Sequence, residues 1–86
     1  MPYSPIPCSI HDHLELACIA GALLRIDCDS GETLEATAIT IQARSDKTEW
    51  LLCQLPDNKQ QAIRLDHIKG FEPISPKGLF PRIELP

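Results

Sequence analysis

Two cysteines and two histidines lie close together near the start of the chain, and both residue types are common zinc ligands. One short stretch contains all four residues, Cys8, His11, His13 and Cys18. A structural zinc site combines a C-x₂₋₄-C pair with an H-x₃₋₅-H pair, and neither spacing occurs here. If the stretch is helical, His11 and His13 also point to different sides of the helix. The sequence therefore predicts no metal site and no bound cofactor.

Catalysis would require a nucleophile with a general base beside it. Cys18 and His67 are candidates for such a pair, but no sequence signature surrounds either residue. The four glycines form no phosphate-binding loop. A chain of 86 residues forms one domain and has little room for a deep cleft. We therefore predict that the protein is not an enzyme.

The charge of the chain is acidic and unevenly distributed. There are 12 Asp and Glu against 8 Lys and Arg, which gives a net charge of −4. Residues 1–40 carry six acidic side chains and one basic side chain, a balance of −5, whereas residues 41–86 carry six acidic and seven basic side chains, a balance of +1. A phosphate-binding surface needs a basic stripe, so direct nucleic-acid binding is not expected. An acidic surface suits a basic partner, including a protein that itself binds nucleic acid.

The cysteine pattern and the chain start predict where the protein resides. Residues 1–7 are punctuated by proline and lack the apolar core of a signal peptide, and no apolar run reaches transmembrane length. The four cysteines contain no C-x-x-C pair. We expect a cytoplasmic protein with reduced thiols and no membrane association, in which Cys18, Cys28 and Cys53 are small core side chains.

Residues 9–19 have the spacing of a helix. Ser9 is a candidate N-cap, Asp12 stands where it would complete a capping box, and Gly21 offers a C-terminal exit. One stripe is apolar and should pack on the rest of the protein: Ile10, Leu14, Ala17 and Cys18. The opposite side carries two acids and two aliphatics: Asp12, Glu15, Leu16 and Ile19. Single exposed aliphatics are common, so this side is either an ordinary solvated surface or a docking face for a partner.

The remainder of the chain has the alternation and turn signals of short antiparallel strands. Five strands are expected, at residues 22–29, 33–43, 49–55, 60–65 and 68–71. In the second strand the inward positions change parity after Ala38, which predicts a bulge or a sharp bend. The third strand is almost wholly apolar at its centre, which predicts an interior strand with Trp50 in the core.

This order of elements predicts a mainly β protein. The expected fold is a small five-stranded antiparallel barrel of the Sm-like or SH3-like kind, with one N-terminal α-helix. Residues 1–8 would form an extended leader, and residues 9–72 would form the barrel domain with its helix at about 9–19. Residues 73–86 are rich in proline and are expected to form a tail with little regular structure.

Several segments resemble the Rof family, small bacterial proteins that bind the transcription termination factor Rho and act as antiterminators. The most specific segment is the helix motif D-x-L-E-L-A-C from Asp12 to Cys18. The resemblance continues at residues 29–36 and 63–68, and it spans about residues 6–72. It departs at Ser9-Ile10, where the family carries a more acidic pair, so the acidic patch is weaker in this chain. The family implies an Sm-like barrel with an N-terminal helix.

The resemblance also implies a function. Proteins of this family inhibit Rho without catalysis, by binding the N-terminal RNA-binding domain of the Rho hexamer and obstructing its primary RNA site. The residues expected to contact Rho lie on the helix and the first hairpin: His11, Asp12, Glu15, Leu16, Ile19, Asp27, Asp29 and Glu32. The alternative is an Sm-like module that binds single-stranded RNA directly, although the basic residues available for this are interleaved with acidic ones.

Overall fold

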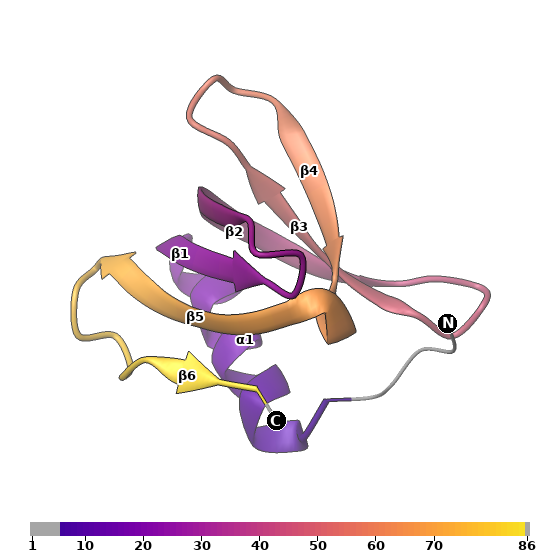
Figure 1. Cartoon of the computed structure of the whole chain (residues 1–86). Coiled ribbons are helices and arrows are strands. Elements are labelled where there is room, and N and C mark those ends of the chain that lie inside the picture. Colours follow the sequence, from indigo (N-terminus) through magenta and orange to yellow (C-terminus); the bar gives the residue numbers. More distant parts are fainter. Residues whose placement is uncertain (1–5, 86) are drawn as a thin grey trace.

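Helix α1 (Cys8–Ala20) lies against one curved antiparallel sheet in the computed structural model, which describes residues 6–85 (Figure 1). Residues 1–5 of the predicted leader lie outside the described residues. Cys8, which was also assigned to the leader, forms the first residue of the helix. No helix in residues 6–85 is long and apolar enough to cross a membrane.

The helix begins one residue earlier than predicted and without a side-chain cap. The N-cap is Pro7, whose carbonyl oxygen accepts hydrogen bonds from the amides of Ile10 and His11, both at 3.1 Å. Ser9 is therefore already inside the first turn, and Asp12 lies beyond it, so the predicted capping box is wrong. The predicted exit is confirmed: Gly21 adopts the left-handed conformation, with φ of 61°.

The sheet contains six strands, not the five that the sequence predicts. They are β1 (Leu23–Cys28), β2 (Thr33–Ala43), β3 (Glu49–Gln54), β4 (Gln60–Arg64), β5 (Ile68–Ser75) and β6 (Ile83–Glu84). Their order is β4-β3-β2-β1-β5-β6, so β4 and β6 are the edges and the sheet is not closed by hydrogen bonds into a barrel. The 3₁₀ turn η1 (Leu65–His67) connects β4 to β5. The mainly β fold with one N-terminal helix is confirmed.

The predicted C-terminal tail takes part in the sheet. Strand β5 continues through Pro73 to Ser75, and β6 pairs with β5 at Gly70 and Phe71. Pro73 fits inside β5 because β6 does not extend that far, so no partner on that side needs its missing N–H. The expectation that regular structure ends at about residue 72 is therefore wrong.

Strand β2 bends at a bulge, as the parity change predicts. Ala38 pairs with Cys53 and Thr40 pairs with Leu52, so Ile39 is an extra residue on β2. After this point the strand turns and leads into the long β2–β3 hairpin (Figure 1). The bulge bends β2, so that its two halves run in different directions. This bend lets one sheet curve around a small core.

The core lies between the concave side of the sheet and α1. Its fully buried members include Leu14 from the helix and five large side chains from the sheet and η1: Leu24, Ile26, Leu51, Leu65 and Phe71. Strand β3 is interior, as predicted, but Trp50 is half-buried and outside the core. The reason is the two-residue period of a strand: Leu51 and Cys53 point inward, so Trp50 points the other way.

Candidate functional site

The outer face of α1 is held in place by the apolar face beneath it. Leu14 and Ala17 are completely buried and Ile10 is nearly so, as the helical spacing predicts. Fully burying side chains of this kind contributes roughly 1.5–3 kcal/mol for each large aliphatic residue. The helix is therefore fixed in rotation, and the direction in which its outer side chains point is determined by the core.

Four of the predicted contact residues lie together on this outer face. Asp12 and Glu15 are exposed, and so are the two aliphatic side chains, Leu16 at 40% and Ile19 at 84%. Leu16 and Ile19 are the two large exposed aliphatic side chains in the described residues. We call Asp12, Glu15, Leu16 and Ile19 the outer face of α1. It combines negative charge with apolar surface, the mixture that protein contacts use.

His11, the fifth predicted helix residue, has a structural contact that the sequence did not reveal. Its Nδ1 lies 3.1 Å from a carboxylate oxygen of Glu15, one turn along the helix. Its Nε2 lies 2.9 Å from a carboxylate oxygen of Glu49, at the start of β3. His11 thus ties the helix to the sheet and orients Glu15, and its ring is only partly exposed.

The residues considered as zinc ligands do not converge. His13 Nδ1 donates to the carbonyl oxygen of Ser9 at 2.6 Å, and its ring packs edge-on against Phe80, with centroids 5.2 Å apart. The two histidines therefore point to different sides, as predicted. Among residues 6–85, the donor atoms that do converge belong to His11, Asp12 and Glu15, which lie within 4.8 Å of one another.

A shallow groove of about 240 Å³ runs beside the outer face of α1. Its lining combines the helix with β2 just after the bulge: Glu15, Cys18, Ile19, Thr40 and Ile41. Partial burial and the nearby Glu15 carboxylate raise the pKa of the Cys18 thiol to about 11, so this thiol is protonated at neutral pH. The groove has an apolar floor and an acidic rim. It extends the apolar surface of Ile19 onto the sheet.

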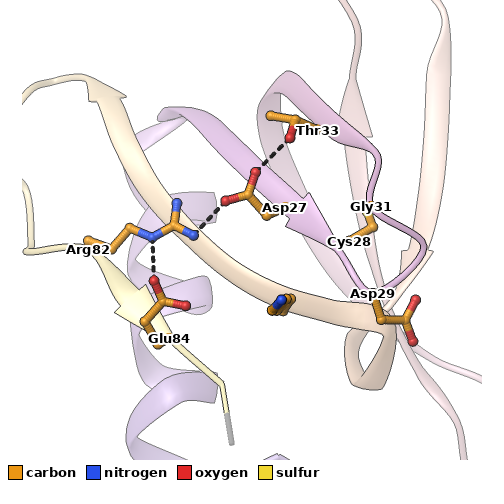
Figure 2. A pocket seen from close by; sticks show the side chains of 8 residues that line it. Asp27, Cys28, Asp29, Gly31, Thr33, Arg82 and Glu84 are labelled. Atoms are coloured by element: carbon orange, nitrogen blue, oxygen red, sulfur yellow. Dashed lines mark hydrogen bonds and ion pairs between the residues drawn. The ribbon is translucent and has the colours of Figure 1, made fainter.

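The three predicted hairpin residues do not form one site, because Asp27 is engaged within the protein. Its carboxylate accepts a hydrogen bond from the Thr33 hydroxyl at 2.8 Å and pairs with Arg82 at 2.5 Å (Figure 2). The Thr33 hydrogen bond, followed by Arg82, holds the pKa of Asp27 below its usual range. Asp27 is therefore a structural anchor, and its availability as a contact for Rho is reduced.

Arg82 forms ion pairs with acidic side chains of three strands, of which Asp27 on β1 is the first. Its guanidinium also lies 3.2 Å from Glu72 on β5 and 2.9 Å from Glu84 on β6. The hydrogen bonds to Asp27 and Glu84 raise its own pKa. These pairs attach the C-terminal segment to β1 and β5 over a pocket of about 410 Å³. This role was not predictable from a local pattern, because Arg82 lies 55 residues along the chain from Asp27.

Asp29 and Glu32 remain exposed in the turn between β1 and β2. The turn is rigid: the amide of Cys28 donates to the carbonyl oxygen of Glu32 at 2.8 Å, and Gly31 supplies a φ of 90°. The amide of Asp29 donates to the carbonyl oxygen of His67 at 2.9 Å, which fixes the turn to η1. The Asp29 carboxylate points away from Arg82 (Figure 2). These two acids form a second exposed acidic pair.

Within the described residues, 6–85, the candidate nucleophile and base do not form a pair. Cys18 lies against β2, whereas His67 lies in η1 and lines a different groove. Burial raises the pKa of the Cys53 thiol to about 11 and also raises that of Cys28, which removes their nucleophilic thiolate forms at neutral pH. Fold and site together define a small, mainly β protein with exposed acidic side chains on its helix and in its first turn.

Comparison with known proteins identifies the family. The model of the family described as modulator of Rho-dependent transcription termination (ROF) matches residues 5–85, and the chain belongs to this family. The resemblance inferred from the helix motif is therefore confirmed. The family is regulatory and not enzymatic, in agreement with the prediction made from the sequence.

Individual relatives share most of the chain. Protein rof of Escherichia coli strain K12 and protein rof of Shigella flexneri are each 35% identical to it over 69 residues, which is 80% of this chain and 80% of each relative. A solved structure described as YaeO bound to magnesium, from Vibrio cholerae O395, superimposes with a TM-score of 0.74 at 25% identity. The match covers 85% of this chain and 94% of the Vibrio chain.

Proposed function

We propose that this protein inhibits Rho by binding its N-terminal RNA-binding domain through the outer face of α1 and obstructing the primary RNA site. Membership of the family makes Rho-dependent termination the process that the protein modulates. The observation that carries the finer proposal is the outer face itself, where Asp12 and Glu15 stand beside two exposed aliphatic side chains.

Electrostatics supports this choice of surface. A site that binds RNA phosphates is basic, and an acidic protein can compete for it. The chain carries a net charge of −4, and its first forty residues carry −5. In the proposed complex, Asp12 and Glu15 face basic side chains of Rho, and Leu16 and Ile19 become buried. Aliphatic burial supplies affinity, while the charges direct the approach and fix the orientation.

Other predicted contacts have different roles in this proposal. His11 orients Glu15 through the contact described above, so it acts on the interface indirectly. Asp29 and Glu32 are accessible and add to the negative field, whereas Asp27 is already paired with Arg82. The proposal assigns no role to magnesium, the ion named in the description of the Vibrio structure. His11 is held by two carboxylates, and Mg²⁺ prefers oxygen ligands in octahedral geometry, so the group of His11, Asp12 and Glu15 is a poor match.

Direct RNA binding is the alternative function, and one observation favours it. The Arg44 guanidinium lies 4.0 Å from the centre of the half-exposed Trp50 ring, an aromatic and cationic pair of the kind that stacks on bases. Against this, that face of the ring is already covered by Arg44. The net charge of the chain also repels phosphate. We rank this function second.

A competition experiment tests the proposal. Fluorescein-labelled cytidine-rich RNA is bound to the Rho hexamer, and the protein is added while anisotropy and RNA-dependent ATPase activity are followed at low salt. The proposal predicts release of the RNA, loss of ATPase activity and co-elution of the protein with Rho. Co-elution without RNA release would place the contact elsewhere on Rho. A salt-sensitive shift of the RNA by the protein alone would favour the alternative.

A further inference from the structure

A second groove, of about 220 Å³, lies between the β1–β2 turn and the edge strand β4. Four consecutive residues of β4 form one wall, Gln61, Ala62, Ile63 and Arg64. The opposite wall is the turn that carries Asp29 and Glu32, and Trp50 also lines the groove. We call this feature the β4 groove. Asp29 and Glu32 were expected from the sequence to contact a partner, but a groove between them and β4 was not.

The β4 groove and the outer face of α1 are different surfaces. His11 of the helix contacts Glu49, and Trp50, the next residue on β3, lines the β4 groove. Consecutive side chains of a strand point to opposite faces of the sheet. The β4 groove also shares no lining residue with the groove beside α1, so a ligand in it would occupy a different part of the surface.

The wall of the groove is an open sheet edge. Strand β4 is hydrogen-bonded to β3 on one side, and within residues 6–85 no strand pairs with its other side. The strand contains no proline and no inward-pointing charge, two of the usual protections of an edge; Ile63 is its buried residue. Such an edge can accept an extended chain through backbone hydrogen bonds.

The charges that line the groove favour a cationic ligand. The Asp29 and Glu32 carboxylates are exposed, and the structure pairs neither of them with a cation. Arg64, the basic residue of the opposite wall, is held by Asp66 through two hydrogen bonds of 2.6 and 2.9 Å. His67 completes the lining. With Arg64 balanced by Asp66, the two carboxylates leave the groove net negative.

Trp50 narrows the choice of cation to a guanidinium. One face of its ring is covered by the Arg44 guanidinium, 4.0 Å from the ring centre, so an incoming side chain would contact the rest of the ring. A planar guanidinium stacks on an aromatic ring and also forms paired hydrogen bonds with carboxylates, whereas an ammonium acts as a point charge. An aromatic ring and two carboxylates around one groove are a combination suited to arginine.

We propose that the β4 groove binds an extended peptide segment that pairs with the free edge of β4 and inserts an arginine side chain between Asp29, Glu32 and Trp50. The segment is thus a short β-strand with an arginine at its centre. This site is distinct from the outer face of α1. The two proposals share only Asp29 and Glu32, which line the groove and add to the negative field proposed to act on Rho. The backbone of β4 supplies general affinity, and the acidic turn with Trp50 supplies the selection for arginine.

Trp50 is the one tryptophan of the chain, so its fluorescence reports directly on the groove. The probe is the capped peptide acetyl-TVRVT-amide, titrated against the full-length protein. A matched peptide carries citrulline, which is neutral and nearly the same shape, in place of arginine. We expect saturable binding of the arginine peptide with a Kd of about 0.1–1 mM, and about tenfold weaker binding of the citrulline peptide.

Two protein variants and one backbone variant complete the test. Asp29→Asn with Glu32→Gln should weaken the arginine peptide about tenfold, while Asp12→Asn with Glu15→Gln removes the same charge from the helix and should leave the Kd unchanged. Methylating the peptide amides that face β4 should abolish binding. Equal affinity for the citrulline peptide, or for the methylated one, would overturn the proposal. The proposal would also be overturned if sedimentation showed that the protein is a dimer and that the peptide does not dissociate it.

Discussion

Substituting Gly70 in β5 by alanine tests how tightly the C-terminal segment packs against that strand. The conformation of Gly70 is not left-handed, so a turn does not explain the absence of a side chain. A methyl group at position 70 would lie 2.6 Å from Nη2 of Arg82, 2.9 Å from Oε2 of Glu84 and 3.1 Å from the carbonyl oxygen of Ile83. The first two atoms end flexible side chains that are held by ion pairs, and the third is backbone of β6. Gly70→Ala therefore pushes the Arg82 ion pairs and β6 away from β5.

The cost follows from the size of the overlap. Adding a methyl group where neighbours cannot withdraw freely costs about 1–3 kcal/mol. For a domain of 60–100 residues this corresponds to a fall in Tm of about 4–24 °C. Urea denaturation and thermal melting followed by circular dichroism measure both quantities. An unchanged stability would show that the C-terminal segment is packed more loosely than the structure indicates.

A double-mutant cycle with Arg82→Ala isolates the mechanism. Without the guanidinium, the closest of the three contacts disappears and Glu84 is free to move, so Gly70→Ala should cost less than about 1 kcal/mol in that background. The expected coupling between the two positions is therefore about 1–2 kcal/mol. If the two free energies simply add, the strain at Gly70 does not act through Arg82 and the reasoning is refuted.

Three further predictions concern the core, acid stability and the thiols. Leu14→Ala should lower the free energy of unfolding by about 2–5 kcal/mol in urea titrations, because that side chain is completely buried under α1. The pKa of Asp27 is lowered below 3.8 in the folded state. The Asp27 carboxylate therefore stabilises the fold above that pH, and this stabilisation is lost as the pH falls through the folded pKa. In a plot of Tm against pH, Asp27→Asn should reduce the fall of Tm on the acid side. Iodoacetamide should modify Cys8, which is exposed, much faster than Cys18 or Cys53, as measured by mass spectrometry of the native protein.

Each of these predictions has an outcome that would contradict it. A cost below 1 kcal/mol for Leu14→Ala would mean that α1 contributes little to the core. An acid limb that is identical in Asp27→Asn would show that the Thr33 and Arg82 contacts do not persist in solution. Rapid alkylation of Cys53 in the native protein would mean that β3 opens readily.

The periodic features of the chain were predictable from the sequence. The helix stripe of Ile10, Leu14 and Ala17 and the parity change after Ala38 both report local geometry, and both are confirmed. Predictions from local sequence were wrong where the backbone conformation, not the residue type, decided the outcome. The carbonyl of Pro7 starts the helix before Ser9 can cap it. The alternation of β3 turns Trp50 outward although the three residues that follow it are apolar.

Contacts between distant parts of the chain were not predictable from one sequence. The pair of His11 with Glu49 spans 38 residues, and the pair of Arg82 with Asp27 spans 55. Neither has a spacing rule, because each depends on how the sheet curves. The same is true of β6, whose two residues become a strand only because β5 offers them an edge. As a result, the acidic hairpin predicted as one site divides into a paired Asp27 and an accessible Asp29 and Glu32.

The most direct test of the proposed function reverses the charge of the outer face of α1. Because Asp12 does not cap the helix and both side chains are exposed, Asp12→Lys with Glu15→Lys should leave the fold intact. The matched control, Glu35→Lys with Asp57→Lys, reverses two exposed charges that lie on other elements. Circular dichroism melts establish that both proteins are folded before binding is compared.

Affinity for the Rho hexamer is then measured by competition with labelled cytidine-rich RNA. Two lost charge pairs at a partly desolvated contact are worth about 2 kcal/mol or more together, and the introduced lysines add repulsion from a basic site. We predict that the helix variant binds Rho at least about 30-fold more weakly and no longer releases RNA, while the control behaves as the wild type. A folded helix variant that still displaces RNA at the wild-type concentration would contradict the central claim.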